Sequence, residues 1–205
     1  MLVPAIVLAA AAGIAAAIQQ SGSSIATARI LEAIGTKPGI TVCEMGAGDG
    51  ELSLAAAKAV GAQGRVLTSE LGDDRVKTLQ RNVSEKAEAG SGTITVVAGD
   101  PNRTNFDEGA CDALFMRNVY HHFKDPPTIT ASMLKSMKPG GKVAVVDFTP
   151  PDKEAPTPAD RDKDNMHGVL PDSVKRELTA AGFEIVGSED ASQRWFMVVA
   201  ARPRN

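Results

Sequence analysis

The chain has 205 residues, of which 43% are hydrophobic and 23% are charged, and this composition is typical of a folded globular protein and excludes a disordered one. Its 22 basic and 25 acidic side chains give a formal net charge of -3, which argues against a dedicated nucleic-acid-binding protein. The length suits one domain with a full core and is short for two.

The residues that most often bind metals are few. The chain has two cysteines, Cys43 and Cys111, which do not form a Cys-x-x-Cys pair. It has three histidines, His121, His122 and His167. We therefore expect no structural zinc site. Each cysteine lies beside an apolar, strand-like segment, and we interpret both as buried free thiols.

The N-terminal part of the chain is unusually apolar. Residues 1–28 carry no charged side chain, and residues 2–18 are almost wholly hydrophobic. This length is at the short limit for a membrane span, and the stretch lacks the basic residues that precede the apolar core of a secretion signal. A signal-like or membrane-anchoring segment, with membrane association through residues 1–18, and a docked Ala-rich helix both fit. We take residues 1–23 as this segment with its linker and residues 24–205 as a single domain.

Helix-like and strand-like segments then alternate along the chain. Ser24 is a candidate cap for a first helix, in which Ile25, Ala28, Leu31 and Ile34 share one face. Alternation of this kind predicts parallel βαβ units. The expected strands cover residues 40–45, 65–70, 93–98, 112–117 and 142–148, and the expected helices cover residues 52–60, 73–89 and 128–137.

The C-terminal part differs from this pattern. A polar, Pro-rich segment over residues 149–170 is followed by a helix over residues 172–181 and by two strands over residues 183–187 and 195–201. These two strands are too close in sequence for a helical crossover, so they must pair antiparallel at the sheet edge. The predicted fold is an α/β, Rossmann-like doubly wound sheet that is mostly parallel with an antiparallel C-terminal strand pair.

A glycine-rich loop follows the first strand, in the sequence Glu44-Met45-Gly46-Ala47-Gly48-Asp49-Gly50. Ligands of open α/β sheets bind beyond the carboxyl ends of the strands, which is where this loop lies. A dinucleotide fold needs a third glycine at the position occupied here by Glu51, and a phosphate-binding loop of the P-loop type needs a lysine, which is absent. The loop therefore favours a ligand without a phosphate group.

Further motifs follow in a fixed order. Glu70 closes the second strand, Gly99-Asp100-Pro101 closes the third, the segment 117–123 (RNVYHHF) closes the fourth, and Pro139-Gly140-Gly141 precedes the fifth. With the glycine loop, this ordered set resembles the class I S-adenosylmethionine-dependent methyltransferases, from about Ile25 to the end of the chain.

The resemblance implies S-adenosyl-L-methionine as the cofactor and assigns it a set of residues. The loop would wrap the methionine end, Glu70 would accept hydrogen bonds from the ribose hydroxyls, and Asp100 would contact the adenine amino group. Two alternatives remain open at this point, because Asp49 is also a favoured helix cap and Asp100 a favoured turn residue. The implied cofactor-binding residues are Glu44, Gly46, Gly48, Asp49, Gly50, Glu70, Asp100 and Asn118.

The resemblance also implies methyl transfer to a small-molecule acceptor by in-line displacement. His121 and His122 are candidate general bases for the acceptor. Tyr120 and His167 are expected to line its pocket. No metal is expected, because the fourth strand ends in Arg117-Asn118 instead of the acid that a metal-assisted catechol mechanism requires.

Two other functions remain to be separated from this one. A protein that binds S-adenosylmethionine without transferase turnover, tethered to a membrane by its N-terminal segment, would have the same motifs. A nicotinamide-dependent reductase is opposed by Glu51. Because the cofactor is made in the cytosol, we expect the catalytic domain to be cytoplasmic, and the acidic balance argues against DNA or RNA as acceptor.

Overall fold

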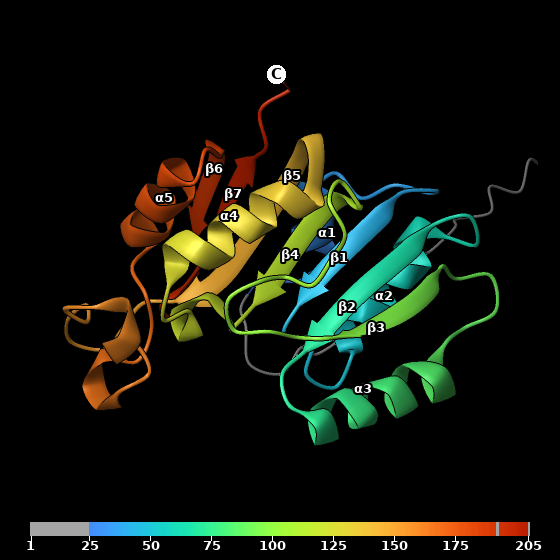
Figure 1. Cartoon of the computed structure of the whole chain (residues 1–205), viewed down its shortest axis with the longest axis horizontal. Coiled ribbons are helices and arrows are strands. Elements are labelled where there is room, and N and C mark those ends of the chain that lie inside the picture. Colours follow the sequence, from blue (N-terminus) through green and yellow to red (C-terminus); the bar gives the residue numbers. More distant parts are fainter. Residues whose placement is uncertain (1–24, 192, 205) are drawn as a thin grey trace, which may run out of the picture.

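The computed structural model describes residues 25–191 and 193–204, which form a seven-stranded sheet flanked by helices (Figure 1). The strand order is β3-β2-β1-β4-β5-β7-β6. The strands are β1 (Thr41–Met45), β2 (Arg65–Glu70), β3 (Thr93–Ala98), β4 (Cys111–Arg117), β5 (Met137–Phe148), β6 (Glu184–Asp190) and β7 (Trp195–Ala201). The helices are α1 (Thr27–Ala33), α2 (Glu51–Val60), α3 (Asp73–Lys86), α4 (Pro126–Ser136) and α5 (Pro171–Ala180).

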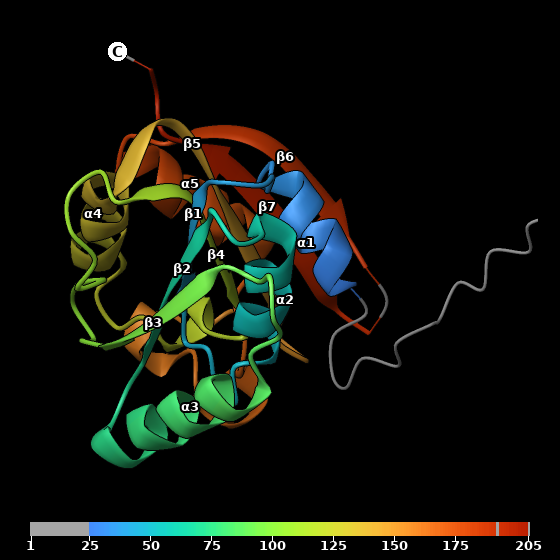
Figure 2. The ribbon, with the colours of Figure 1, turned by 90° about the vertical axis from the view of Figure 1, so that its right-hand side faces the viewer.

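The sheet separates two apolar clusters, one on each face. One cluster joins α1 and α2 to side chains such as Val42, Val66 and Phe115. The other joins α4 and α5 to the opposite face, with Leu114 and Met116 among its members. Figure 2 shows α1 and α2 on one side of the sheet and α4 on the other. β1 and β4, in the middle, are buried on both faces, as expected of parallel strands covered by helices.

The C-terminal strands confirm the predicted antiparallel pair. β7 pairs antiparallel with β5 on one side and with β6 on the other, so that β6 forms the sheet edge. The other neighbouring strands, from β3 to β5, are parallel. The fold is therefore the Rossmann-like, mostly parallel sheet that the sequence predicts.

Two local details differ from the prediction. Ile25, Leu31 and Ile34 are buried as predicted, but Ala28 is exposed. Thr27 and Ile30 complete the buried face, because positions 27, 30, 31 and 34 follow the helical period. β5 begins at Met137 and includes the expected Pro-Gly-Gly turn, where the pairing with β4 shifts in register.

The two cysteines are bonded to each other, so the interpretation of two free thiols was wrong. Cys43 in β1 and Cys111 at the start of β4 form a disulfide, with their Cα atoms 5.7 Å apart and both side chains fully buried. The residues are 68 positions apart in sequence and become neighbours only because β4 pairs with β1. The disulfide ties together the two strands whose carboxyl ends form the site described below.

The hydrophobic N-terminal segment predicted over residues 1–23, and Ser24 as a helix cap, lie outside the described residues. Within the described ranges, no helix is both long enough and apolar enough to span a membrane.

Candidate functional site

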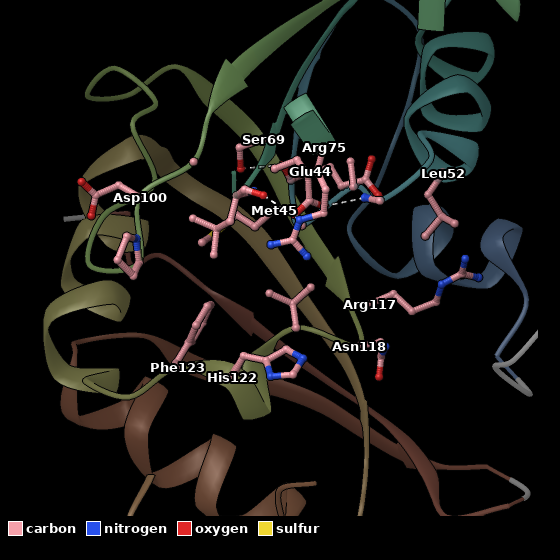
Figure 3. A pocket seen from close by; sticks show the side chains of 18 of the residues that line it. Glu44, Met45, Leu52, Ser69, Arg75, Asp100, Arg117, Asn118, His122 and Phe123 are labelled. Carbon is pink, nitrogen blue, oxygen red and sulfur yellow. Dashed lines mark hydrogen bonds and ion pairs between the residues drawn. The ribbon is translucent and has the colours of Figure 1, made fainter. Parts of the chain in front are cut away.

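A cavity of about 1000 Å³ lies at the carboxyl ends of the parallel strands (Figure 3). Glu44, Met45 and Ser69 form one wall, and His122 and Phe123 face them across the cavity. Asp100 and Arg117 lie toward opposite ends of the view. The lining residues thus come from the ends of β1, β2 and β4 and from the turn after β3, and they differ in charge from one part of the cavity to another. Its other lining residues include Gly46, Gly48, Asp49, Glu51, Glu70, Arg75, Gly99, Arg103, Asn118, Val119, Lys124, Asp162 and Trp195.

The three loop glycines have left-handed backbone conformations, with φ of +69° at Gly46, +53° at Gly48 and +85° at Gly50. A Cβ atom on Gly46 would lie 2.4 Å from a methyl group of Val119, and one on Gly50 would lie 2.9 Å from Leu79 and Val83 of α3. Gly48 has open space around it. The first and third glycines are therefore required for packing as well as for the backbone turn.

Four amide groups of the loop are hydrogen-bonded within the protein and are not free to bind an anion. Gly46 N and Ala47 N both donate to the carbonyl of Ser69, at 2.9 and 3.0 Å, and Gly50 N donates to the carbonyl of Ala47 at 2.9 Å. Gly48 N donates to the carboxylate of Glu70 at 2.7 Å. A phosphate site needs such N–H groups free to point at the ligand. Their internal pairing agrees with the prediction of a ligand without phosphate.

Glu70 ends β2 as predicted and is buried. One carboxylate oxygen accepts from Gly48 N and the other accepts from Leu71 N at 2.8 Å. Arg75 Nε lies 3.7 Å from the second oxygen. An ionised carboxylate has about four acceptor positions, so two remain after the backbone bonds. Glu70 therefore holds the glycine loop in place and keeps acceptor capacity toward the cavity.

Glu44 is almost completely buried at the end of β1, with 3% of its surface exposed. It accepts a hydrogen bond from the Ser53 hydroxyl, which is also hydrogen-bonded to the Thr68 hydroxyl at 2.9 Å. Burial raises the pKa of Glu44 to about 7, although the Ser53 bond and the charge of Arg117 act in the opposite direction. The carboxyl group is therefore near half protonation at neutral pH.

Asn118 and Arg117 close β4 at the opposite side of the loop. Asn118 has φ of +62°, an uncommon conformation that Asn tolerates better than most residues, and its N–H donates to the Val146 carbonyl at 2.9 Å. Arg117 Nη2 lies 3.6 Å from the carboxylate of Glu51. Its Nη1 is buried and has no hydrogen-bond partner among the described residues. Sequence reasoning missed this guanidinium as a ligand group, because its approach to the cavity depends on the path of β4.

Asp49 lines the cavity, and α2 begins at Glu51 with Gly50 as its N-cap residue and no side-chain cap, so the alternative of Asp49 as a helix cap is absent from this structure. Asp100 also lines the cavity, but its carboxylate accepts from Asn102 N at 2.8 Å and from Arg103 Nε at 3.2 Å. Asp100 therefore stabilises the turn after β3, which is the alternative that the sequence left open for it.

The histidines form one cluster. His121 and His122 lie in the 3₁₀ turn η1 (Tyr120–His122), and His167 follows the turn η3 (Asp164–Met166). The Nε2 atoms of His121 and His167 are 3.0 Å apart. His121 is buried, His122 lines the cavity, and His167 lies in the predicted acceptor segment without lining the cavity itself. Of the two candidate bases, only His122 can therefore touch a ligand in the cavity.

Asp147 in β5 fixes the orientation of His121. One Asp147 oxygen accepts from His121 Nδ1 at 2.9 Å, and the other accepts from His121 N at 3.1 Å. Burial lowers the pKa of His122 and of His167, and the neighbouring His121 lowers both further. The cluster is therefore built around a buried, carboxylate-oriented imidazole.

Tyr120 does not lie where the sequence suggested. Its side chain is fully buried in the core and stacks at 5.0 Å on Phe123, so the structure places it behind the cavity wall. Burial raises the pKa of its phenol well above the ordinary value, and the neighbouring Glu177 carboxylate adds to the effect. The direction of η1 turns its first side chain inward and its last toward the cavity, which residue type alone does not reveal.

The segment 149–170 is attached to the fold at defined points. The buried guanidinium of Arg161 pairs with Glu177 on α5, with one Nη1–oxygen distance of 3.1 Å, and Gly168 N donates to the Arg161 carbonyl at 2.9 Å. Asp162, next to this anchor, reaches the cavity, as does Trp195 at the start of β7. Trp195 was not a predicted site residue, because it comes from the antiparallel strand and not from a parallel strand end.

Three features define the class of protein: the open α/β sheet with its antiparallel terminal pair, the glycine loop with four paired amides, and the acids around this loop. They are the features expected of a class I methyltransferase. A family model described as a methyltransferase domain matches residues 43–145. The chain belongs to this family, and the resemblance to class I S-adenosylmethionine-dependent methyltransferases is confirmed.

Individual relatives agree with this assignment. The chain is 26% identical over 124 residues to a ubiquinone/menaquinone biosynthesis C-methyltransferase of Shewanella pealeana, a match that covers 60% of this chain and 49% of the relative. It is 28% identical over 123 residues to the nocamycin O-methyltransferase of Saccharothrix syringae, covering 60% and 43%. The matches thus span about half the length of these curated relatives.

Solved structures share the fold. A SAM-dependent methyltransferase from Aquifex aeolicus superposes with a TM-score of 0.71 at 20% identity, covering 85% of this chain and 88% of the other. The [4+2]-cyclase SpnF superposes with a TM-score of 0.72 at 18% identity, covering 87% and 80%.

Proposed function

We propose that the chain transfers a methyl group from S-adenosylmethionine to a small-molecule acceptor. The observation that carries this proposal is the charge around the glycine loop. Glu44, Asp49, Glu51 and Glu70 line this end of the cavity, and the amides of Gly46, Ala47, Gly48 and Gly50 are already paired. Four acids around these paired amides suit a ligand with a sulfonium and an ammonium group, and they oppose a pyrophosphate.

In this proposal the methionine end of the cofactor lies along residues 44–50. Glu70 receives the ribose hydroxyls at its remaining acceptor positions, and Asn118 borders the methionine moiety. The unpaired Nη1 of Arg117 provides a partner for the cofactor carboxylate. The Arg117 side chain is 17% exposed, and charge-assisted hydrogen bonds between a guanidinium and a carboxylate are strong. Asp100 binds the adenine end, and it does so only if its carboxylate exchanges the Arg103 contact for the adenine amino group.

The acceptor occupies the opposite part of the cavity, near His122, Trp195 and Asp162. Phe123 and Trp195 contribute aromatic surface to the cavity lining, which suits an apolar or aromatic molecule, and His122 is the general base of the pair proposed from the sequence. Methyl transfer by in-line displacement depends mainly on alignment and on a deprotonated nucleophile. His122→Ala should therefore lower the rate of methyl transfer more than the affinity for the cofactor, and unchanged turnover in both His121→Ala and His122→Ala would reject the base.

Calorimetry tests the cofactor assignment directly. S-adenosylhomocysteine and NADH are titrated separately into the full chain, with Asp74→Asn as a control variant whose side chain is fully exposed. We expect binding of S-adenosylhomocysteine only. Tight binding of NADH without binding of the homocysteine analogue would reject the proposal. A labelled-cofactor screen against cell extract, with mass identification of the product, then identifies the acceptor.

A second candidate is a cofactor-binding protein without transferase turnover. The specific observation in its favour is the similarity to SpnF, because a cyclase shares this fold with a TM-score of 0.72. The two candidates differ in one measurement: a binding protein retains S-adenosylhomocysteine in calorimetry and releases no labelled product with any extract fraction.

The cellular compartment is also a proposal. The site of cofactor synthesis favours the cytoplasm, whereas a disulfide between Cys43 and Cys111 is typical of oxidising compartments. Rapid quenching of cells with acid, followed by alkylation of the denatured protein, separates the two, because both cysteines are buried in the folded chain. A cytoplasmic protein should then have both cysteines alkylated and an exported one neither. Fractionation of the full chain against one lacking residues 1–20 tests the membrane association, and equal solubility of both would count against it.

A further inference from the structure

The chain has three histidines, and the fold brings all three together. His121 and His122 come from the turn after β4, and His167 comes from the segment after β5, 45 residues further along the chain than His122. One ring nitrogen from each lies within 4.8 Å of the others. We propose that His121, His122 and His167 bind one transition-metal ion of the Zn²⁺ type, with Asp147 orienting the first of these ligands.

The orientation of His121 is the first argument. Its Nδ1 lies 2.9 Å from the Asp147 carboxylate, so Nδ1 carries the proton and Nε2 presents its lone pair. That Nε2 points toward His167 and not toward a donor from the sheet. A histidine that donates one ring N–H to a carboxylate and offers the other nitrogen outward is the usual arrangement of a metal-binding imidazole.

The spacing of the nitrogens is the second argument. Zinc–nitrogen bonds of about 2.0–2.1 Å in a tetrahedral site place two ligand nitrogens about 3.3 Å apart. The His121 and His167 Nε2 atoms are 3.0 Å apart, close to this value. His122 and His167 both have exposed surface, so small rotations of these rings can bring the third nitrogen within range. His121 is rigid and buried, which gives the site one fixed ligand and two adjustable ligands.

The donor set is the third argument, and it selects the class of metal. Three imidazoles suit zinc and its neighbours cobalt, nickel and copper, and they do not suit magnesium or calcium, which prefer oxygen ligands. Three protein ligands also leave one coordination position open, as in catalytic zinc sites. Because both cysteines are in the disulfide, no thiolate of the chain competes for the ion.

The position of the cluster gives the site its function. His122 lines the cavity on the wall opposite the glycine loop, so the open position adjoins the space proposed for the acceptor. The ion would bind an oxygen or sulfur atom of the acceptor there and lower the pKa of that group. In the metal-bound chain the ion would therefore replace His122 as the group that activates the acceptor, because a metal-bound imidazole has no free lone pair to accept a proton. This role rests on the proposed methyl transfer, whereas the metal site itself does not.

A chain of hydrogen bonds is one other explanation for the cluster. His167 Nε2–H could donate to His121 Nε2, which would make the cluster a chain of hydrogen bonds from Asp147 to the surface. Such a chain of hydrogen bonds needs only His121 and His167, so replacing His122 should not affect it. The metal site needs all three.

The test is a titration of the tag-free, metal-depleted full chain with Co²⁺, whose visible absorption reports four-coordinate binding, and with Zn²⁺ by calorimetry. We expect one ion per chain, and a loss of at least tenfold in affinity in His122→Ala and in His167→Ala. Asp147→Asn should weaken binding about 10- to 100-fold, since it removes the group that orients His121. Asp74→Asn, which removes one exposed acid far from the cluster, should bind metal as the wild type does.

Each variant is also titrated with S-adenosylhomocysteine, which shows that it is folded and tests the cofactor assignment separately. Absence of stoichiometric Co²⁺ and Zn²⁺ binding by a chain that binds S-adenosylhomocysteine would overturn the metal site alone. Binding of the ion with unchanged affinity in His122→Ala would overturn it as well. Metal binding without any binding of the homocysteine analogue would instead overturn the proposed function and leave the site in place.

Discussion

The raised pKa of Glu44 makes a quantitative prediction about stability. Its ordinary value is 4.5, and burial in the folded chain raises it to about 7. Between these two values the folded state holds a proton that the unfolded chain has lost. The free energy of unfolding should therefore fall as the pH rises from about 4.5 to about 7, and the difference of roughly 2.5 units corresponds to about 3 kcal/mol.

Glu44→Gln should remove this pH-dependent loss of stability, because Gln has nearly the same shape as Glu and does not ionise. The amide oxygen can still accept from Ser53, and no proton is lost at higher pH. At pH 8 the variant should be more stable than the wild type by up to about 3 kcal/mol, which in a domain of this size raises the Tm by roughly 6–12 °C. At pH 4.5 the two proteins should unfold at nearly the same temperature.

The measurement is a series of urea and thermal unfolding curves of both proteins from pH 4.5 to 8. Glu51→Gln is the matched control, because Glu51 is an acid that lines the same cavity with 54% of its side chain exposed. A constant difference between Glu44→Gln and the wild type across this range would refute the reasoning. It would mean that the Glu44 carboxyl is ionised in the folded chain at all these pH values, with Arg117 compensating for its burial.

Three further perturbations follow from the structure. Replacing Cys111 by Ala should lower the free energy of unfolding by about 4 kcal/mol, because the disulfide closes a loop of 68 residues, and urea unfolding of oxidised and reduced wild type should show the same difference. Gly46→Ala should cost more stability than Gly48→Ala, since both incur about 1–2 kcal/mol of backbone strain and only the first adds a clash with Val119. Combining Gly46→Ala with Val119→Ala should recover part of the loss. Equal melting temperatures of the two single variants would contradict this reasoning. Glu70→Gln should weaken S-adenosylhomocysteine binding roughly 10- to 100-fold in calorimetry, because a charged acceptor of the Gly48 N–H and of the ribose becomes neutral, and unchanged affinity would remove Glu70 from the cofactor site.

The sheet and the glycine loop could be predicted because their signals are local. Apolar runs of strand length, separated by helices with an apolar face, determine the alternation, and the short distance between the last two strands excludes a crossover. Glu44 to Gly50 lie in one continuous loop, so their proximity follows from the chain itself. Glu70 required only that neighbouring parallel strands end at the same edge of the sheet.

The features that sequence reasoning missed depend on which strands are neighbours and on how one turn is rotated. Cys43 and Cys111 meet because β4 lies beside β1 in the sheet, although β2 and β3 separate these two strands in the sequence. Tyr120 and His122 are two residues apart, yet a 3₁₀ turn directs the first into the core and the second into the cavity. Neither outcome follows from hydrophobic periodicity, because both residue types are compatible with either environment.

The histidine cluster combines both kinds of information. His121 and Asp147 are 26 positions apart, and they meet because β4 and β5 pair in parallel and the turn after β4 folds back over the end of β5. Asp147 is a fully buried carboxylate next to the last residue of β5, and a buried carboxylate requires a hydrogen-bond partner. His121 satisfies this requirement, and its second nitrogen is then left facing His167, which Arg161 and Gly168 hold in position. The burial of one carboxylate thus determines the direction of the imidazole from which the proposed metal site is built.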